Sequence, residues 1–152
     1  MKTLNDKVLN QLLTKIVATH EYSIKLGGSI ITSNTELLND TSIEVIYNNT
    51  KSLKNILSNE YAYFGIVDNK IIIVVLNTFK PDQENCSIKI PFNSIAYIDI
   101  KKGFLNKYIY SINTINGGNL KFQITNNSGS NDIAKQKESA LELYDVLNNI
   151  KN

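Results

Sequence analysis

The sequence predicts an α+β fold that is mainly β: a small antiparallel barrel capped by one C-terminal helix. Two observations predict it. Residues 61–125 contain six strand candidates in a row, and a single long amphipathic helix follows them. A length of 152 residues fits one domain, which is large enough to bury a core without disulfides or metal.

Composition narrows the classes of partner. Hydrophobic residues make up 42% of the chain and charged residues 20%, which is ordinary for a soluble globular protein. The formal net charge of +2 is too small to indicate a nucleic-acid or membrane partner by itself. All 16 basic residues are lysine, a composition that an AT-rich genome also produces. Because lysine lacks the planar fork that grips phosphate or guanine bidentately, we expect no nucleic-acid partner and no arginine-clamped phosphoryl site.

The cysteine content and the hydropathy pattern predict a cytoplasmic protein. Cys86 is the lone cysteine, so no disulfide can form within the chain, and its alternating strand segment favours a small buried side chain. No apolar run approaches the roughly 18 residues of a membrane span. Residues 1–17 lack the compact apolar core of a signal peptide.

The N-terminal residues place apolar side chains at helical spacing, which predicts an amphipathic helix of about five turns. We expect it to end near His20 and the chain to break at Gly27 and Gly28. This divides the chain into a helical extension (residues 1–28) and a barrel domain (residues 29–152). The pattern of residues 29–40 is ambiguous, because Ile30-Ile31 fits a short strand and residues 35–38 fit a helical turn. The apolar stripe consists of Leu4, Val8, Leu9, Leu12, Leu13, Ile16 and Val17.

The next segments predict a first set of strands. Residues 42–47 alternate, and residues 61–67 and 71–76 are apolar runs joined through Asp68 and Asn69, which both tolerate the positive φ of a tight hairpin turn. Because residues 71–76 are apolar on both faces, we expect a central strand covered on both sides. Residues 77–85 form an exposed loop in this prediction.

Alternation predicts four further strands, at residues 86–90, 96–101, 108–114 and 120–125. Turns are expected at Lys102-Gly103 and at residues 116–119, and the total is seven strands. The C-terminal helix carries an apolar stripe along one side. Leu141 and Val146 lie off this stripe, and we expect them to offer apolar surface to a partner. The stripe consists of Ile133, Ala140, Leu143, Tyr144, Leu147 and Ile150.

Three runs carry a resemblance to bacterial pleckstrin-homology-like domains, over residues 41–150. Residues 61–75 resemble that family's second hairpin, which turns at Thr/Val-Asp-x-Lys/Arg, here Val67-Asp68-Asn69-Lys70. Residues 90–95 (IPFNSI) are similar to its Ile-Pro-hydrophobic-x-x-Ile link, and residues 101–107 (KKGFLNK) to its Lys-Gly-Leu-hydrophobic-Gly-Lys turn. The resemblance implies a seven-stranded, bent, partly open barrel with one mouth plugged by the C-terminal helix. Because this family includes proteins that oligomerise, the resemblance also implies self-association of this chain.

Catalysis is not expected from these residues. With one histidine, His20, and one cysteine, no thiolate–imidazole metal cluster can assemble, so we expect no metal and no cofactor. His20 is better explained as a partner for the negative end of a helix dipole than as a catalytic base. Asp82 and Glu84 fit a solvated loop better than a pair of catalytic carboxylates. We therefore expect a protein that is not an enzyme.

The candidate ligand-binding residues are lysines. Lipid-binding pleckstrin-homology domains carry a basic triad that ends in the second strand; here the loop offers Lys51 and Lys54, but residues 61–67 contain no basic residue. Lys101, Lys102 and Lys107 cluster at another turn, where Lys70 would extend a mild basic patch. The alternative is that these lysines keep edges and turns soluble.

The function expected from the sequence is an interaction or scaffolding module that acts as a homo-oligomer or with another protein. The alternative is attachment to a membrane surface, or to an anionic ligand, through the barrel-loop lysines. The apolar stripe of the N-terminal helix leaves three options open: packing on the barrel, pairing with a second copy, or lying on a membrane.

Overall fold

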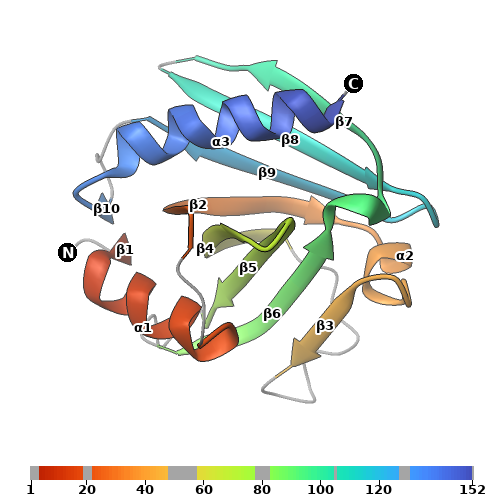
Figure 1. The fold of residues 1–152 in the computed structure, drawn as a ribbon, viewed down its shortest axis with the longest axis horizontal. Coiled ribbons are helices and arrows are strands. Elements are labelled where there is room, and N and C mark those ends of the chain that lie inside the picture. Colours follow the sequence, from red (N-terminus) through yellow and green to blue (C-terminus); the bar gives the residue numbers. More distant parts are fainter. Residues whose placement is uncertain are drawn as a thin grey trace.

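The structure is a computed structural model that describes residues 4–18, 22–47, 58–77, 83–104, 106–126 and 131–151. Most of these residues lie in antiparallel strands, with one longer helix before the sheet in sequence and one after it (Figure 1). The helices are α1 (Asp6–Ile16), α2 (Thr35–Leu38) and α3 (Gln136–Lys151). The strands are β1 (Leu4–Asn5), β2 (Ile24–Ser33), β3 (Glu44–Tyr47), β4 (Ser58–Val67), β5 (Lys70–Leu76), β6 (Glu84–Pro91), β7 (Ile95–Lys102), β8 (Lys107–Thr114), β9 (Asn119–Thr125) and β10 (Asn131–Asp132).

One eight-stranded sheet organises the described part of the chain, in the order β3-β6-β5-β4-β2-β9-β8-β7. All its neighbours are antiparallel, and β2 joins its two halves by pairing with β4 and with β9. The β2–β9 register shifts between Ile30 and Thr32, the kind of irregularity that bends a strand. A separate parallel pair, β1 and β10, lies outside this sheet. The predicted mainly β fold with an N-terminal and a C-terminal helix is confirmed.

Strand β2 includes the short strand at Ile30-Ile31 that the sequence analysis left open, but it starts much earlier, at Ile24. The expected break at Gly27 and Gly28 is wrong, because both glycines lie inside this strand. A Cβ on Gly27 would come within 2.7 Å of the Leu4 side chain and 2.8 Å of the Ile133 side chain. A Cβ on Gly28 would come within 2.5 Å of Ile124. The glycines thus allow close packing on both faces of β2, and the proposed division at residue 28 would pass through it.

Strand β5 is buried on both faces, as predicted. Ile71, Ile73 and Val75 belong to the core between the two halves of the sheet, which we call the inner core. Ile72, Val74 and Leu76 belong to a second cluster, the outer core. Each of these six side chains is at most 3% exposed. A strand of this kind needs a cover on each side.

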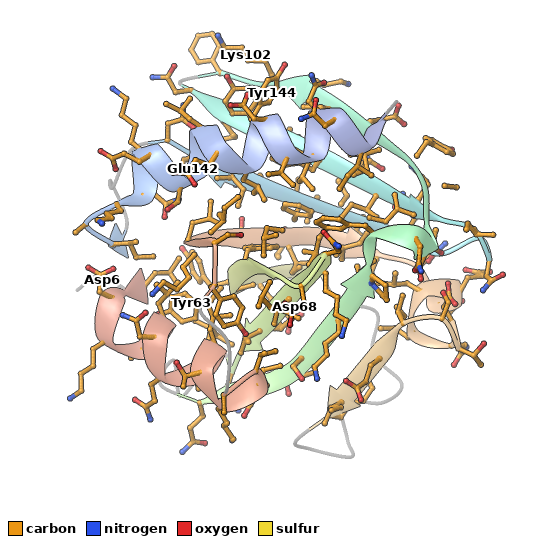
Figure 2. The ribbon with its side chains drawn as sticks, in the orientation of Figure 1. Asp6, Tyr63, Asp68, Lys102, Glu142 and Tyr144 are labelled. Carbon is orange, nitrogen blue, oxygen red and sulfur yellow. The ribbon has the colours of Figure 1, made fainter. Side chains whose placement is uncertain are left out.

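Helix α1 supplies the outer cover, so its apolar stripe packs on its own chain. Leu9, Leu12 and Leu13 are buried in the outer core with Tyr63 of β4, and Figure 2 shows Tyr63 beside α1. The helix is 11 residues long, shorter than the predicted five turns. It starts late because the Asn5 side chain caps it, accepting a hydrogen bond from the Val8 N–H at 3.0 Å.

Helix α3 covers the inner core with the predicted stripe. Ala140, Leu143 and Leu147 are buried there, with Ile150 and Val146 packed against them. Ile133, expected on that stripe, precedes the helix and lies in the outer core instead. Of the two residues expected to offer apolar surface to a partner, Leu141 stays 45% exposed, whereas Val146 packs against the inner core.

The start of α3 is tied to the middle of the sheet and to α1. Gln136 is 1% exposed, and its amide oxygen accepts from the Gly27 N–H at 3.0 Å. Its amide nitrogen donates to the carbonyls of Gly27 at 2.9 Å and Thr125 at 3.0 Å. On the α1 side, the Asp6 carboxylate accepts from the Ala134 N–H at 3.1 Å. The two helices therefore meet at one corner of the barrel.

The predicted tight turns are present. Asp68 and Asn69 have φ values of 51° and 58° in the β4–β5 hairpin, the left-handed region that asparagine and aspartate tolerate. Gly117 has a φ of 90° in the β8–β9 turn. None of the described helices combines the length and apolarity needed to span a bilayer.

If α1 is part of the folding unit, truncating its buried face destabilises the whole domain. We expect Leu13→Ala to lower the free energy of unfolding by about 2–5 kcal/mol, because Leu13 is fully buried in the outer core. The matched control is Leu141→Ala on the exposed side of α3, which should change it by less than about 0.5 kcal/mol. Urea unfolding followed by circular dichroism measures both, and equal effects would contradict this assignment.

Candidate functional site

The described residues offer little for catalysis. Among them, no group of three or more His, Cys, Asp or Glu side chains could hold a metal ion. His20 and Asp82 lie outside the described residues. Cys86 is fully buried, as predicted, and burial, together with Glu60 and Glu84, raises the pKa of its thiol to about 12. A thiol of this kind stays protonated and is a poor nucleophile.

Glu84 corrects the expectation of an exposed loop over residues 77–85. It begins β6 and is 7% exposed. Its carboxylate accepts a hydrogen bond from the Lys15 ammonium at 2.5 Å. Because a buried carboxylate requires a compensating partner, Glu84 acts as an attachment point for α1 and not as a solvated acid.

A buried carboxylate, Asp40, organises the end of the barrel where α2 meets the β8–β9 turn. It is 7% exposed and accepts hydrogen bonds from the Ser42 N–H at 2.8 Å and the Ser42 hydroxyl at 2.6 Å. Thr114 donates at 2.9 Å and Asn116 at 3.0 Å. Burial by itself would raise the pKa of Asp40, but these hydrogen bonds outweigh it and lower the pKa to about 2.

The surface around Asp40 does not suit an anionic ligand. The hollow there is lined by Thr35, Glu36, Asn39, Asp40, Thr41 and Asn116. Two of these six residues are acidic and none is basic, so the field in the hollow repels phosphate. Lys51 and Lys54, the loop lysines proposed from the sequence, lie outside the described residues, and their role stays a prediction.

The other four candidate lysines fall into two places. Lys101 and Lys102 end β7 and Lys107 begins β8, so these three share one hairpin end, closed by a hydrogen bond from the Gly103 N–H to the Lys107 carbonyl at 2.6 Å. Lys70 opens β5 on a different hairpin. Figure 2 shows Lys102 at the upper extremity of the molecule, beyond α3, whereas Asp68 of the β4–β5 turn lies on the other side of that helix. The structure therefore separates Lys70 from the proposed patch.

We call Lys101, Lys102, Gly103, Phe104 and Lys107 the β7–β8 tip. Its Phe104 is 85% exposed and belongs to neither core. Sequence reasoning did not single this residue out. The available signal was a large aromatic side chain outside both strand alternations, in a turn between lysines.

Strand β7 is an edge of the sheet. It pairs with β8 on one side, and no described strand pairs with its other side. Tyr97 on its outer face is 51% exposed, and Asp99 and Lys101 follow on the same face. A cavity of about 640 Å³ opens beside it. This cavity is lined by Ile31, Asp99, Ile100, Lys101, Ile109, Ser111 and Lys121.

The lowered pKa of Asp40 predicts how stability depends on pH. Because the carboxylate is favoured in the folded state, its contribution is present above about pH 4 and is lost as pH falls toward 2. At neutral pH we expect Asp40→Asn to cost about 1–3 kcal/mol of unfolding free energy, and the difference from wild type to shrink below pH 4. Urea unfolding at a series of pH values measures it. Glu36→Gln, an exposed carboxyl group of the same hollow, is the control and should have little effect.

Comparisons with known proteins find little that is similar. No protein-family model matches the chain, and no curated protein matches it. Among solved structures, the chain is similar to the pleckstrin homology (PH) domain of USP37, with 14% sequence identity and a TM-score of 0.46. The alignment covers 85% of this chain and 97% of that chain. The strand order and the helix positions of the chain itself therefore define its fold.

Proposed function

We propose that this chain is a non-catalytic interaction module that self-associates through the free edge of β7. The described residues support a binding role more than a reaction, because the single thiol is buried and Asp40 is occupied by hydrogen bonds within the fold. We also propose that the chain is related to bacterial pleckstrin-homology-like domains, which it resembles in sequence. Members of that family that oligomerise support the proposal of self-association.

The free edge is the observation that carries the proposal. An eight-residue strand with no described strand on its second side offers its backbone N–H and C=O groups there for pairing with another strand. In Figure 1, β7 runs along the upper border of the molecule. A second copy of β7 can reach this edge without displacing a described strand.

The charges of β7 are complementary to themselves. In an antiparallel pair of β7 strands with Ile100 opposite its own copy, Asp99 of each strand lies opposite Lys101 of the other. Such pairs of opposite charge stabilise a sheet by about 0.2–1 kcal/mol each. Sliding the pair so that Asp99 lies opposite its own copy sets two like charges against each other. The charge pattern thus favours one register, with two-fold symmetry.

The association is expected to be weak. Edge pairing of a single strand buries much less surface than a standard stable interface of about 1,600 Å². We therefore expect a monomer at low concentration and a dimer that appears as concentration rises.

A charge-reversal set tests the pairing. Asp99→Lys alone and Lys101→Asp alone should each abolish dimerisation, because like charges then face each other across the pair. An equimolar mixture of the two single variants should form heterodimers, and the double variant should dimerise as wild type does. Size-exclusion chromatography with light scattering over a concentration series measures the mass.

The matched control is Lys7→Asp, which reverses an exposed charge on α1 and should leave the mass unchanged. A wild-type chain that stays monomeric at high concentration would contradict the proposal. Single variants that dimerise as wild type does would place the interface elsewhere.

A further inference from the structure

A cavity over the middle of β2 has no part in the function proposed above. Its volume is about 460 Å³, within the range of about 300–1,000 Å³ that small-molecule sites occupy. Its polar lining comes from β4, β2 and β9, which are neighbours in the sheet (Figure 1). We call it the β2 cavity, and its lining includes Ser29, Ile31, Asn59, Tyr61, Gln123 and Thr125.

The strand register places three polar side chains of the β2 cavity in one row. Ser29 pairs with Tyr61 of β4 on one side and with Gln123 of β9 on the other. Because residues directly opposite each other in a sheet point to the same face, these three side chains are neighbours on one face. Tyr61 is 45% exposed, so its ring is accessible to a ligand.

Two backbone irregularities border this row. The β2–β9 register shifts at Ile31, which is half-buried in the lining of the cavity. On the β4 side, Asn59 has a φ of 52°, in the left-handed region that glycine enters at lower cost. Bulges are common beside ligand sites, where they redirect a side chain. An asparagine at this φ keeps an amide group at the cavity, where a glycine would leave none.

The polar side chains of the β2 cavity are not occupied within the described fold. Four of them make no hydrogen bond to another described residue, namely those of Ser29, Asn59, Tyr61 and Gln123. The Asp40 hollow differs in this respect, because its carboxylate already accepts hydrogen bonds from its own chain. Hydroxyl and amide groups both donate and accept, so the β2 cavity offers both kinds of hydrogen bond to a ligand.

The chemistry of the lining selects an uncharged ligand. No charged residue lines the β2 cavity in the described part of the chain, so an ionic ligand would find no counter-charge there. What the cavity does offer is hydroxyl and amide groups beside one exposed aromatic ring. A sugar matches both features, because its hydroxyls donate and accept hydrogen bonds and the C–H face of its ring packs on an aromatic side chain.

We propose that the β2 cavity binds an uncharged mono- or disaccharide, with a sugar ring packed on Tyr61 and sugar hydroxyls bonded to Ser29, Asn59 and Gln123. An extended peptide fits less well, because β2 is already paired on both sides and has no free edge to offer. A nucleobase stacks between two flat or apolar walls. Tyr61 is the single aromatic residue in the described lining, which suits one face of a sugar.

This site is independent of the self-association proposed above. The β2 cavity and the free edge of β7 have no described residue in common. A sugar can therefore bind to a monomer or to a β7-paired dimer. Binding is measured at concentrations where the chain is monomeric, so that a failure of β7 pairing does not affect the result.

The experiment titrates isotope-labelled protein with maltose, cellobiose, lactose or diacetylchitobiose and follows the backbone amide signals by NMR. We expect at least one of these disaccharides to bind with a Kd on the order of 1 mM, a value typical of a small polar ligand in an open cavity. The signals that shift should be those of Gly27, Gly28 and Ser29 on β2 and of Gln123 on β9, which all line the cavity.

Substitutions separate the contributions of the ring and of the hydrogen bonds. Tyr61→Ala should weaken binding about ten-fold, whereas Tyr61→Phe keeps the ring and should weaken it by no more than about three-fold. Gln123→Ala should weaken binding about five-fold. The matched control is Tyr97→Ala, which removes a tyrosine that is 51% exposed on β7 and should bind as wild type does. Circular dichroism confirms that each variant is folded.

Three outcomes would overturn the proposal. The first is that none of the four disaccharides shifts the amide signals of the cavity. The second is that Tyr61→Ala binds as tightly as Tyr97→Ala does. The third comes from two comparison ligands, adenosine and inorganic phosphate, which should leave these signals unchanged. Shifts with adenosine alone would indicate a nucleoside site, and shifts with phosphate alone an anion site, and either result would rule out the carbohydrate.

Discussion

The double-sided burial of β5 is the constraint on which the rest of the structure depends. Ile72, Val74 and Leu76 face away from the inner core and would meet water without α1. An apolar face of this size is unfavourable in solution. Helix α1 is therefore a constituent of the domain and not an appendage. Its apolar stripe is buried within the chain and does not support self-association. The free edge of β7 supports self-association instead.

The corner around Gly27 shows how the two helices and the sheet are fitted together. The pairing of β2 with β9 ends at Ser29, which leaves the backbone groups of Gly27 in need of partners. The Gln136 amide offers one donor and one acceptor in the arrangement of a peptide group, and so satisfies both groups of Gly27. Because glycine has no Cβ, Leu4 and Ile133 can pack over it.

Local chemistry decided what could be predicted from the sequence. The Asp68-Asn69 turn and the two-sided strand after it follow from φ preferences and from a run of apolar residues, both readable without tertiary structure. The full length of β2 could not be predicted in this way, because Gly27 and Gly28 are required by close contacts with residues far away in the sequence. Glu84 was misassigned because its partner Lys15 lies 69 positions away. Lys70 was grouped with Lys101 because alternation does not reveal how far a bent sheet separates two hairpins.

The parallel pairing of β1 with β10 has a consequence for how the chain acquires its structure. Leu4 pairs with Asn131, so this contact encloses almost the entire polypeptide and forms only after a large loss of chain entropy. During synthesis, α1 leaves the ribosome long before the segment that secures it. The apolar face of α1 then stays exposed until β5, which covers it in the folded domain, has emerged.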